Sequence, residues 1–438
     1  MKTLGIKLLL SKIKKNKNKI KIFWYIISRM SSANYLNTNS NSNGKTVAAE
    51  GSRVNIEGYN LPVSQSITLN SDLKHEVLVI PSTSAPAFGG FHSIHIREKN
   101  IVLHNLSLQL VLSPVTGTSL AGYFVPAFFF YTKLEVLCGG IVIDTIYNTE
   151  SFLRTQTCHP DEDRISINSS AGLYSSVLQR TGLSNQATSN TFIVSLTSLI
   201  DQCKLNMLNN SHAIEVRVYM DNLANLYTIT SGSNLTATIL SSSLVCGVTR
   251  LDQSTALQRL NEMAEDPFDN IFHETCISSN VIPSGLTSAT IVLNQFVGNM
   301  SHFIFVCRPT ATATSGVGFY TFTQISSFAL LDSGGSTISG TISAALASRL
   351  NSTWILSSYN VENSLSTVDN SANFYQWSHS PDPVSALKSG LSLGSKRYTG
   401  SEQLVVNFRS VLTAPMTIDI YGYREAFMES SLLGIRKR

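Results

Sequence analysis

The chain has 438 residues, of which 43% are hydrophobic and only 14% are charged. This length allows two or three domains, and the hydrophobic content excludes a globally disordered chain. Charged residues make up roughly a quarter of ordinary soluble domains, so a surface this poor in charge favours contact with neighbouring copies.

The amino-terminal residues 1–30 account for the positive net charge of the chain, because the remaining residues together have a net charge of −5. They contain eight Lys, Arg29 and no acidic residue, for a net charge of +9 against +4 for the whole chain. Two interpretations stay open: a basic arm that neutralises nucleic-acid phosphates, or a leader upstream of a true start at Met30. The apolar run 22–27 is far shorter than the ~20 residues that span a bilayer.

Strand patterns dominate once the polar segment 34–52, which we expect to be a flexible arm, has ended. We therefore assign residues 1–54 to a flexible N-terminal segment. His92 and His95 lie three residues apart, a spacing that points them to opposite faces of a strand and disfavours a shared metal. Between 106 and 112, leucine alternates with other residues, which predicts a strand with one face in a core.

An aromatic cluster follows, made of Phe124, Phe128, Phe129, Phe130 and Tyr131. Such a stripe can stack nucleobases, but no Lys or Arg occurs among these residues before Lys133. We therefore favour burial in a sandwich core or in a subunit contact.

A strand, a two-glycine turn and a second strand are predicted over 134–144, with a short helix to Arg154. The same order recurs over 328–350, with a strand to 331, Gly334-Gly335 as the turn, a strand to 338 and a helix from 343. The two glycine pairs lie 195 residues apart. Because the chain after the N-terminal segment is nearly two such lengths, we predict a duplicated β domain.

Weakly periodic segments at 159–190 and 355–395 are predicted to be loops. In the first of them, His159 precedes Asp161-Glu162-Asp163, a set that offers hard oxygen ligands to a divalent cation. A solvated acidic turn is the favoured interpretation.

Alternation at 214–220 and at 416–421 predicts the last strand of each half, and residues 404–408 are expected to form the partner of the final strand. Between the halves, apolar residues at 256, 257, 260 and 263 predict a connecting helix. Asp252 or Ser254 would cap it and Pro267 would stop it. The predicted domains are thus 55–250, a connecting helix at 251–267, and 268–438.

Six cysteines are widely spaced and contain no C-x-x-C pair, which suits buried free thiols in a reducing compartment. No nucleophile elbow, phosphate-binding loop or calcium loop occurs. We therefore predict no enzymatic activity, no metal and no cofactor.

The order E-x-x-x-G-G-x-x-I-D, formed by Glu135, Gly139, Gly140, Ile143 and Asp144, resembles a signature of double jelly-roll major capsid proteins. That family occurs in nucleocytoplasmic large DNA viruses, virophages and polinton-like elements. Residues 400–404 and 414–423 are similar to the closing G and H strands of its second roll, so the resemblance covers 55–425. Cys138 replaces a more usual β-branched residue, and the second glycine pair lacks the acidic residues.

The resemblance implies an all-β fold of two tandem eight-stranded jelly rolls, with short helices in the connections. It also implies homotrimeric, pseudo-hexameric capsomers that tile an icosahedral shell in the virion and assemble inside the host cell. The implied partners are neighbouring capsomers together with penton and minor capsid proteins. Nucleic-acid contact is expected only if residues 1–29 are present, and an internal membrane stays open.

Two alternatives remain. An RNA-virus coat protein would have one jelly roll, a differently connected projecting β domain and residues 1–30 as a genome-binding arm. A cell-surface lectin or adhesin would need secretion and disulfides.

Overall fold

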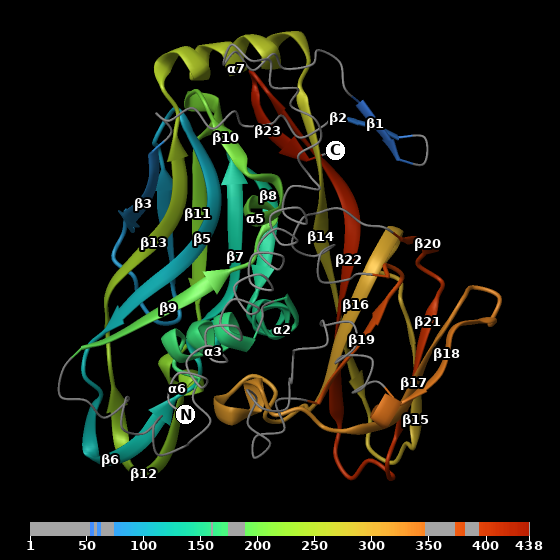
Figure 1. The fold of residues 1–438 in the computed structure, drawn as a ribbon. Coiled ribbons are helices and arrows are strands. Elements are labelled where there is room, and N and C mark those ends of the chain that lie inside the picture. Colours follow the sequence, from blue (N-terminus) through green and yellow to red (C-terminus); the bar gives the residue numbers. More distant parts are fainter. Residues whose placement is uncertain are drawn as a thin grey trace, which may run out of the picture. The chain divides into compact units, whose positions relative to one another are not determined.

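Two β-sandwiches with the same strand order make up most of the chain in the computed structural model (Figure 1). The structure describes residues 53–56, 59–62, 74–158, 161–173, 189–346, 373–381 and 394–437. In the N-terminal unit, which ends at Asp72, β1 (Arg53–Ile56) and β2 (Tyr59–Pro62) pair as an antiparallel hairpin. The rest of the predicted flexible segment, with Met30, lies outside the described residues.

Roll 1 is our name for the first sandwich, which has eight main strands in two antiparallel sheets. The first sheet runs in the order β3 (Lys74–Pro81), β13 (Ile239–Arg250), β5 (Ile101–Leu112) and β9 (Asn190–Leu196). The second runs in the order β4 (Phe91–Ile96), β11 (Ile214–Met220), β7 (Tyr131–Cys138) and β8 (Ile141–Tyr147). The short β10 (Leu205–Met207) also pairs with β5.

Roll 2, the second sandwich, repeats this arrangement strand for strand. Its first sheet runs in the order β14 (Phe268–Ile282), β22 (Met416–Ser431), β16 (Val297–Pro309) and β19 (Phe374–Ser378). Its second runs in the order β15 (Ser288–Val292), β21 (Gln403–Phe408), β17 (Ile325–Leu331) and β18 (Thr337–Ser343). Short strands β20 (Lys396–Thr399) and β23 (Gly434–Lys437) extend the first sheet. The predicted fold class, two tandem eight-stranded jelly rolls, is confirmed.

The duplicated glycine turn lies at the same place in both rolls, between the fourth and fifth main strands. Gly139 and Gly140 have φ values of 58° and 83°, the left-handed conformation that a two-residue hairpin turn requires. Of the glycine pair in roll 2, Gly335 has positive φ and Gly334 does not, and Asp332 accepts hydrogen bonds from the amides of Gly334 and Ser336. The first turn leads into α2 (Asn148–Cys158), which continues one turn beyond Arg154.

Several predicted details were wrong. The segments expected to be loops contain α3 (Asp161–Ser170) and strand β19. Strands β21 and β22 lie in different sheets and do not pair, because consecutive jelly-roll strands cross between sheets. The last strand of roll 1 is β13, not β11, and its run of serines at 241–243 weakens the apolar alternation that would have predicted it.

The connecting helix is confirmed as α7 (Gln253–Glu265), and Oδ1 of Asp252 caps it by accepting a hydrogen bond from the amide of Thr255 at 2.9 Å. Ala256 and Met263 are buried, but Leu257 is 53% exposed and does not pack. The boundaries 55–250, 251–267 and 268–438 remain a proposal. No helix among the described residues is long and apolar enough to cross a membrane.

The connections of roll 1 carry further short elements. Two of them, β6 (Thr116–Phe124) and β12 (Tyr227–Thr236), pair as a separate two-stranded ribbon. The others are short helices: η1 (Ala127–Phe129), α5 (Leu199–Cys203), η2 (Asn210–His212) and α6 (Leu223–Leu226). In roll 2, η3 (Gly316–Phe319) precedes β17.

Candidate functional site

The candidate functional site among the described residues is the junction between the two rolls, where roll 1 packs against the first sheet of roll 2. The two central strands of the first sheet of roll 2, β22 and β16, are buried on both faces along most of their length. Along β22, Ile418 and Ile420 belong to the core of roll 2, whereas Tyr421 and Tyr423 belong to the core that contains roll 1. A strand buried on both faces shows a continuous apolar run rather than alternation, as β16 does at 303–307.

Aromatic rings form the apolar part of this junction. Phe129, from η1 of roll 1, stacks on Phe319 and Tyr320 of roll 2 at centroid distances of 5.2 and 5.8 Å. Phe152 of α2 lies 6.4 Å from Phe322. The predicted aromatic cluster at 124–131 is fully buried, so the core interpretation is confirmed and the nucleobase-stacking interpretation is wrong.

A buried ion pair between Arg308 of β16 and Asp419 of β22 forms the polar part. Nη1 of Arg308 also donates to the carbonyl oxygen of Phe319 at 2.9 Å and to Oγ1 of Thr149, in α2 of roll 1, at 3.4 Å. A buried charge is tolerated only when it is paired and hydrogen-bonded. This guanidinium therefore ties roll 1 to the central strands of roll 2.

Glu150, one residue further along α2, is the second polar link between the rolls. Its Oε1 accepts hydrogen bonds from the Tyr423 hydroxyl at 3.2 Å and from Oγ1 of Thr275 at 3.4 Å, and it pairs with Arg154 at 3.4 Å. Burial raises the pKa of Glu150 to about 7, and the nearby Asp144 carboxylate acts in the same direction. Arg154 opposes this shift without cancelling it.

The five residues of the predicted signature lie around the β7–β8 hairpin of roll 1. Gly139 and Gly140 form its turn, Ile143 is buried, and Asp144 accepts hydrogen bonds from the amides of Leu199 and Thr145 at 2.8 and 2.9 Å. Asp144 thus ties β8 to the start of α5, and burial raises its pKa. That these residues act as a family signature remains a proposal.

Glu135, the first residue of the signature, lies on the outer face of β7. It accepts hydrogen bonds from Nζ of Lys133 at 2.6 Å and from the hydroxyl of Tyr219 at 2.9 Å. Partial burial works in the opposite direction, but these two bonds hold the pKa of Glu135 below its ordinary value. Its contacts connect β7 to β11 within roll 1.

The C-terminal strand contributes a link that the sequence did not predict. Where β22 turns into β23, the carbonyl oxygens of Ser431 and Leu432 accept hydrogen bonds from His212 Nε2 at 2.8 Å and from Asn209 Nδ2 at 3.1 Å. Both donors belong to roll 1, next to and within η2. No apolar periodicity accompanies these contacts, so pattern reasoning had no signal for them.

The histidines and acidic residues considered as metal ligands do not lie together among the described residues. On β4, His92 is buried with Nε2 2.7 Å from Oγ of Ser242, whereas His95 lies on the other face, as predicted. Residues 161–163 begin α3 rather than a loop. Their side chains and His159 lie outside the described residues. Among the residues that are described, no group of three or more His, Cys, Asp or Glu is placed to hold a metal ion.

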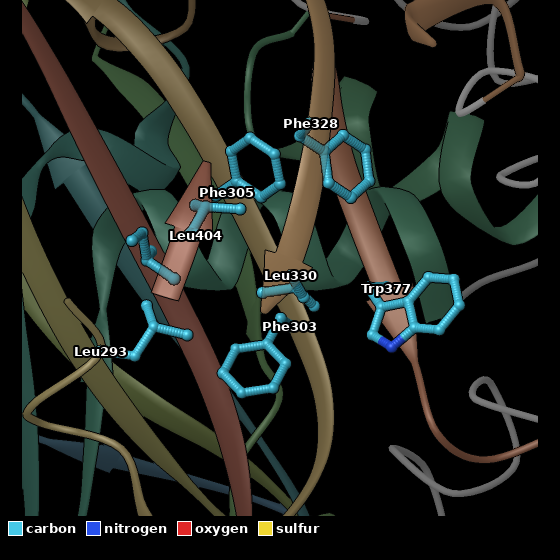
Figure 2. Close-up of a pocket in the computed structure, with 8 residues that line it drawn as sticks. Leu293, Phe303, Phe305, Phe328, Leu330, Trp377 and Leu404 are labelled. Carbon is cyan, nitrogen blue, oxygen red and sulfur yellow. The ribbon is translucent and has the colours of Figure 1, made fainter. Parts of the chain in front are cut away.

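The five cysteines whose side chains the structure describes are all free thiols, which does not favour the disulfide-bearing alternative. A small cavity of about 10 Å³ lies in the core of roll 2, where Figure 2 shows Phe303, Phe305, Phe328 and Trp377 around it. It has the size of about one water-sized probe. A larger hollow lies between β12 and the loop at 309–321, and no charged residue lines it.

Similar proteins were found by structure and not by sequence. No known family pattern and no curated protein matches this chain. Among solved structures, VP54 of the virus PBCV-1, fitted into a reconstruction of the virophage Sputnik, matches with a TM-score of 0.59 at 13% identity, over 83% of this chain and 96% of that one. The Faustovirus major capsid protein matches with a TM-score of 0.59 at 7% identity, over 83% and 92%.

A cryo-EM structure of the Sputnik virophage covers more of this chain, 92% of it and 94% of its own chain, with a TM-score of 0.54 at 11% identity. The predicted resemblance to double jelly-roll major capsid proteins is therefore confirmed at the level of fold.

Proposed function

We propose that this chain is a major capsid protein whose two rolls form one third of a pseudo-hexameric, homotrimeric capsomer. The observation that carries the proposal is the identical strand order of both rolls, in both of their sheets. Two equivalent sandwiches in one chain supply two of six similar positions in a ring. Three chains then close the ring with threefold symmetry.

The buried junction supports this function because it makes the pair of rolls one stiff unit. Aromatic stacking between Phe129 and Phe319 and the hydrogen bonds of Arg308 and Glu150 cross between the rolls. A subunit of a shell needs a fixed angle between its lobes, since each angular error would accumulate around a ring. The proposed function is thus mechanical, and no catalytic step enters it.

The low charge of the chain agrees with large contacts between copies. Obligate interfaces typically bury 2,000 Å² or more and resemble a domain core. Neighbouring capsomers, penton proteins and minor capsid proteins are the further partners that we propose, in a virion assembled inside the host cell. The alternative of a coat protein with a differently connected second domain is not supported by the repeated strand order.

Sedimentation velocity of the purified full-length protein at micromolar concentration tests the proposal. We expect one species with three times the 47.8 kDa mass of a single chain. A folded monomer at this concentration would argue strongly against a capsomer. Mass spectrometry of the mature N-terminus in assembled particles separately tests whether residues 1–29 are present and able to contact nucleic acid.

A further inference from the structure

The hairpin β22–β23, at the C-terminal end of the chain, is held to roll 1 through the imidazole of His212. This side chain is fully buried, with Nε2 2.8 Å from the carbonyl oxygen of Ser431 and Nδ1 3.3 Å from the amide nitrogen of Asn209. Asn209 also donates from Nδ2 to the carbonyl oxygen of Leu432 at 3.1 Å. We call these four residues and their hydrogen bonds the C-terminal latch.

The two partners of His212 require a single protonation state of its ring. A carbonyl oxygen can only accept, so Nε2 carries the hydrogen of the bond to Ser431. A backbone amide can only donate, so Nδ1 accepts from Asn209 and carries no hydrogen. The latch therefore holds the neutral imidazole. Protonation would direct a hydrogen on Nδ1 at the amide hydrogen of Asn209 and break that contact.

The surroundings of His212 do not favour a positive charge on the ring. Burial holds the pKa of His212 below its ordinary value, the hydrogen bond to Ser431 opposes this shift, and no charged side chain contributes to it. The strand β10, which lies against η2, contains no titratable residue. The charged side chains next to the turn between β22 and β23 are already paired: Arg436 with Glu429, and Lys437 with Glu274.

The closed latch covers the thiol of Cys138, at the end of β7. This residue is 3% exposed, and its Sγ lies 3.3 Å from the carbonyl oxygen of Ser211. Gly434 approaches the same oxygen so closely that a Cβ on it would lie 2.9 Å away. Burial raises the pKa of the Cys138 thiol, and a backbone hydrogen bond from Ile435 of β23 opposes the shift. Separation of the hairpin from η2 would therefore expose Cys138.

We propose that the C-terminal latch is an acid-sensitive device, which releases the β22–β23 hairpin from roll 1 when His212 takes up a proton. The contribution of the neutral ring to stability is complete above the ordinary histidine pKa of about 6.5 and is lost as the pH falls below it. The contact between Phe129 and Phe319 contains no group that titrates. Acid thus loosens the junction at the latch and leaves its aromatic part in place, whether or not the chain forms capsomers.

The test measures how fast a pyridyl disulfide, a thiol reagent that remains active in acid, labels single cysteines of the full-length protein. Each rate is divided by that of the same cysteine in the denatured chain at the same pH. Between about pH 7.5 and about pH 5, we expect this relative rate to rise about tenfold for Cys138. For Cys246, which is buried in the core of roll 1, we expect a change of less than about twofold.

Two variants assign the effect to His212. In H212Q, the side-chain amide can donate to the carbonyl oxygen of Ser431 and does not titrate, so the relative rate of Cys138 should stay within about twofold over the same pH range. H95Q is the matched control, because His95 lies on the outer face of β4. We expect it to show the pH dependence of the wild type.

Equal acceleration of Cys138 and Cys246 in the wild type would show that acid unfolds the whole chain, and it overturns the proposal. An H212Q variant with the pH dependence of the wild type also overturns it. If H212Q does not fold, the wild-type comparison still decides, because Cys246 is a control within the same molecule. None of these results bears on the proposed function, which is tested by the mass of the protein near neutral pH.

Discussion

Phe129 of roll 1 and Phe319 of roll 2 lie with their rings 5.2 Å apart and nearly parallel, at an interplanar angle of 17°. Both rings are buried, and they come from the loops that precede the equivalent strands β7 and β17. The two rolls therefore meet through matching parts of their folds. This contact makes the stability of one roll depend on the other.

Replacing Phe129 with alanine is expected to destabilise the protein by about 3–5 kcal/mol, the usual cost of emptying a buried phenylalanine site. Because the lost contacts lie between the rolls, differential scanning calorimetry should show one wild-type transition splitting into two. F91A removes an exposed ring and is the control, with a single transition retained. A single transition in F129A would show that this ring does not couple the rolls.

Replacing Arg308 alone is expected to lower the stability of the protein much more than replacing Arg308 and Asp419 together. R308M leaves the Asp419 carboxylate buried without its charged partner, at an expected cost of about 3–5 kcal/mol. The double variant R308M/D419L removes both charges and should recover most of that loss. Chemical denaturation of the three proteins measures the difference, and a double variant no more stable than R308M contradicts the account.

Glu150 predicts a dependence of stability on pH. Its pKa is raised from 4.5 to about 7 by burial, so its contribution to stability is complete below about pH 4.5 and is lost as the pH rises through 7. E150Q keeps the shape and cannot ionise. Wild-type stability should therefore fall more than that of E150Q between pH 5 and pH 8, by up to about 3 kcal/mol.

The readout is the slope of the melting temperature against pH, because E150Q also leaves Arg154 without its carboxylate and is expected to be less stable overall. Asp201, whose pKa burial raises to about 6, titrates in both proteins and cancels in the comparison. Parallel slopes for the two proteins would mean that Glu150 stays ionised throughout.

Substitution of Gly140 in the β7–β8 turn is expected to lower stability through backbone conformation alone. A Cβ on Gly140 would meet no atom within 4 Å, but its φ is 83°, a conformation that costs an alanine roughly 1–2 kcal/mol. G140A should lose about that much stability in a denaturant titration, and G140N less, since asparagine tolerates the left-handed region. Gly90 has no positive φ, so G90A is the matched control with little expected change.

The sequence predicted those strands that have one buried and one exposed face, because such strands alternate apolar and polar residues. Alternation along β5 and β11 and the paired glycines at 139–140 and 334–335 were enough for a duplicated β-sandwich. The junction was less visible, since a strand buried on both faces can lose its alternation, as β16 does at 303–307. Its polar residues, Arg308 and Glu150, are far apart in the sequence, and only the folded arrangement brings them to Thr149 and Tyr423.

The pairing of the strands was the second feature that the sequence did not predict. Residues 404–408 and 416–421 were each predicted as strands, but nothing local says that a jelly roll places consecutive strands in opposite sheets. The helix α3 was missed because its sequence, Asp-Glu-Asp-Arg-Ile-Ser-Ile-Asn-Ser-Ser, has weak apolar periodicity. Among its described side chains, Asn168 exchanges two hydrogen bonds with Gln156 of α2.

Single-particle cryo-EM of the purified full-length protein tests the central claim most directly, that like-wired rolls form a ring of six lobes from three chains. The account predicts threefold particles in which each chain supplies two adjacent sandwiches. Particles containing one chain, or rings in which one chain supplies a single lobe, would contradict it.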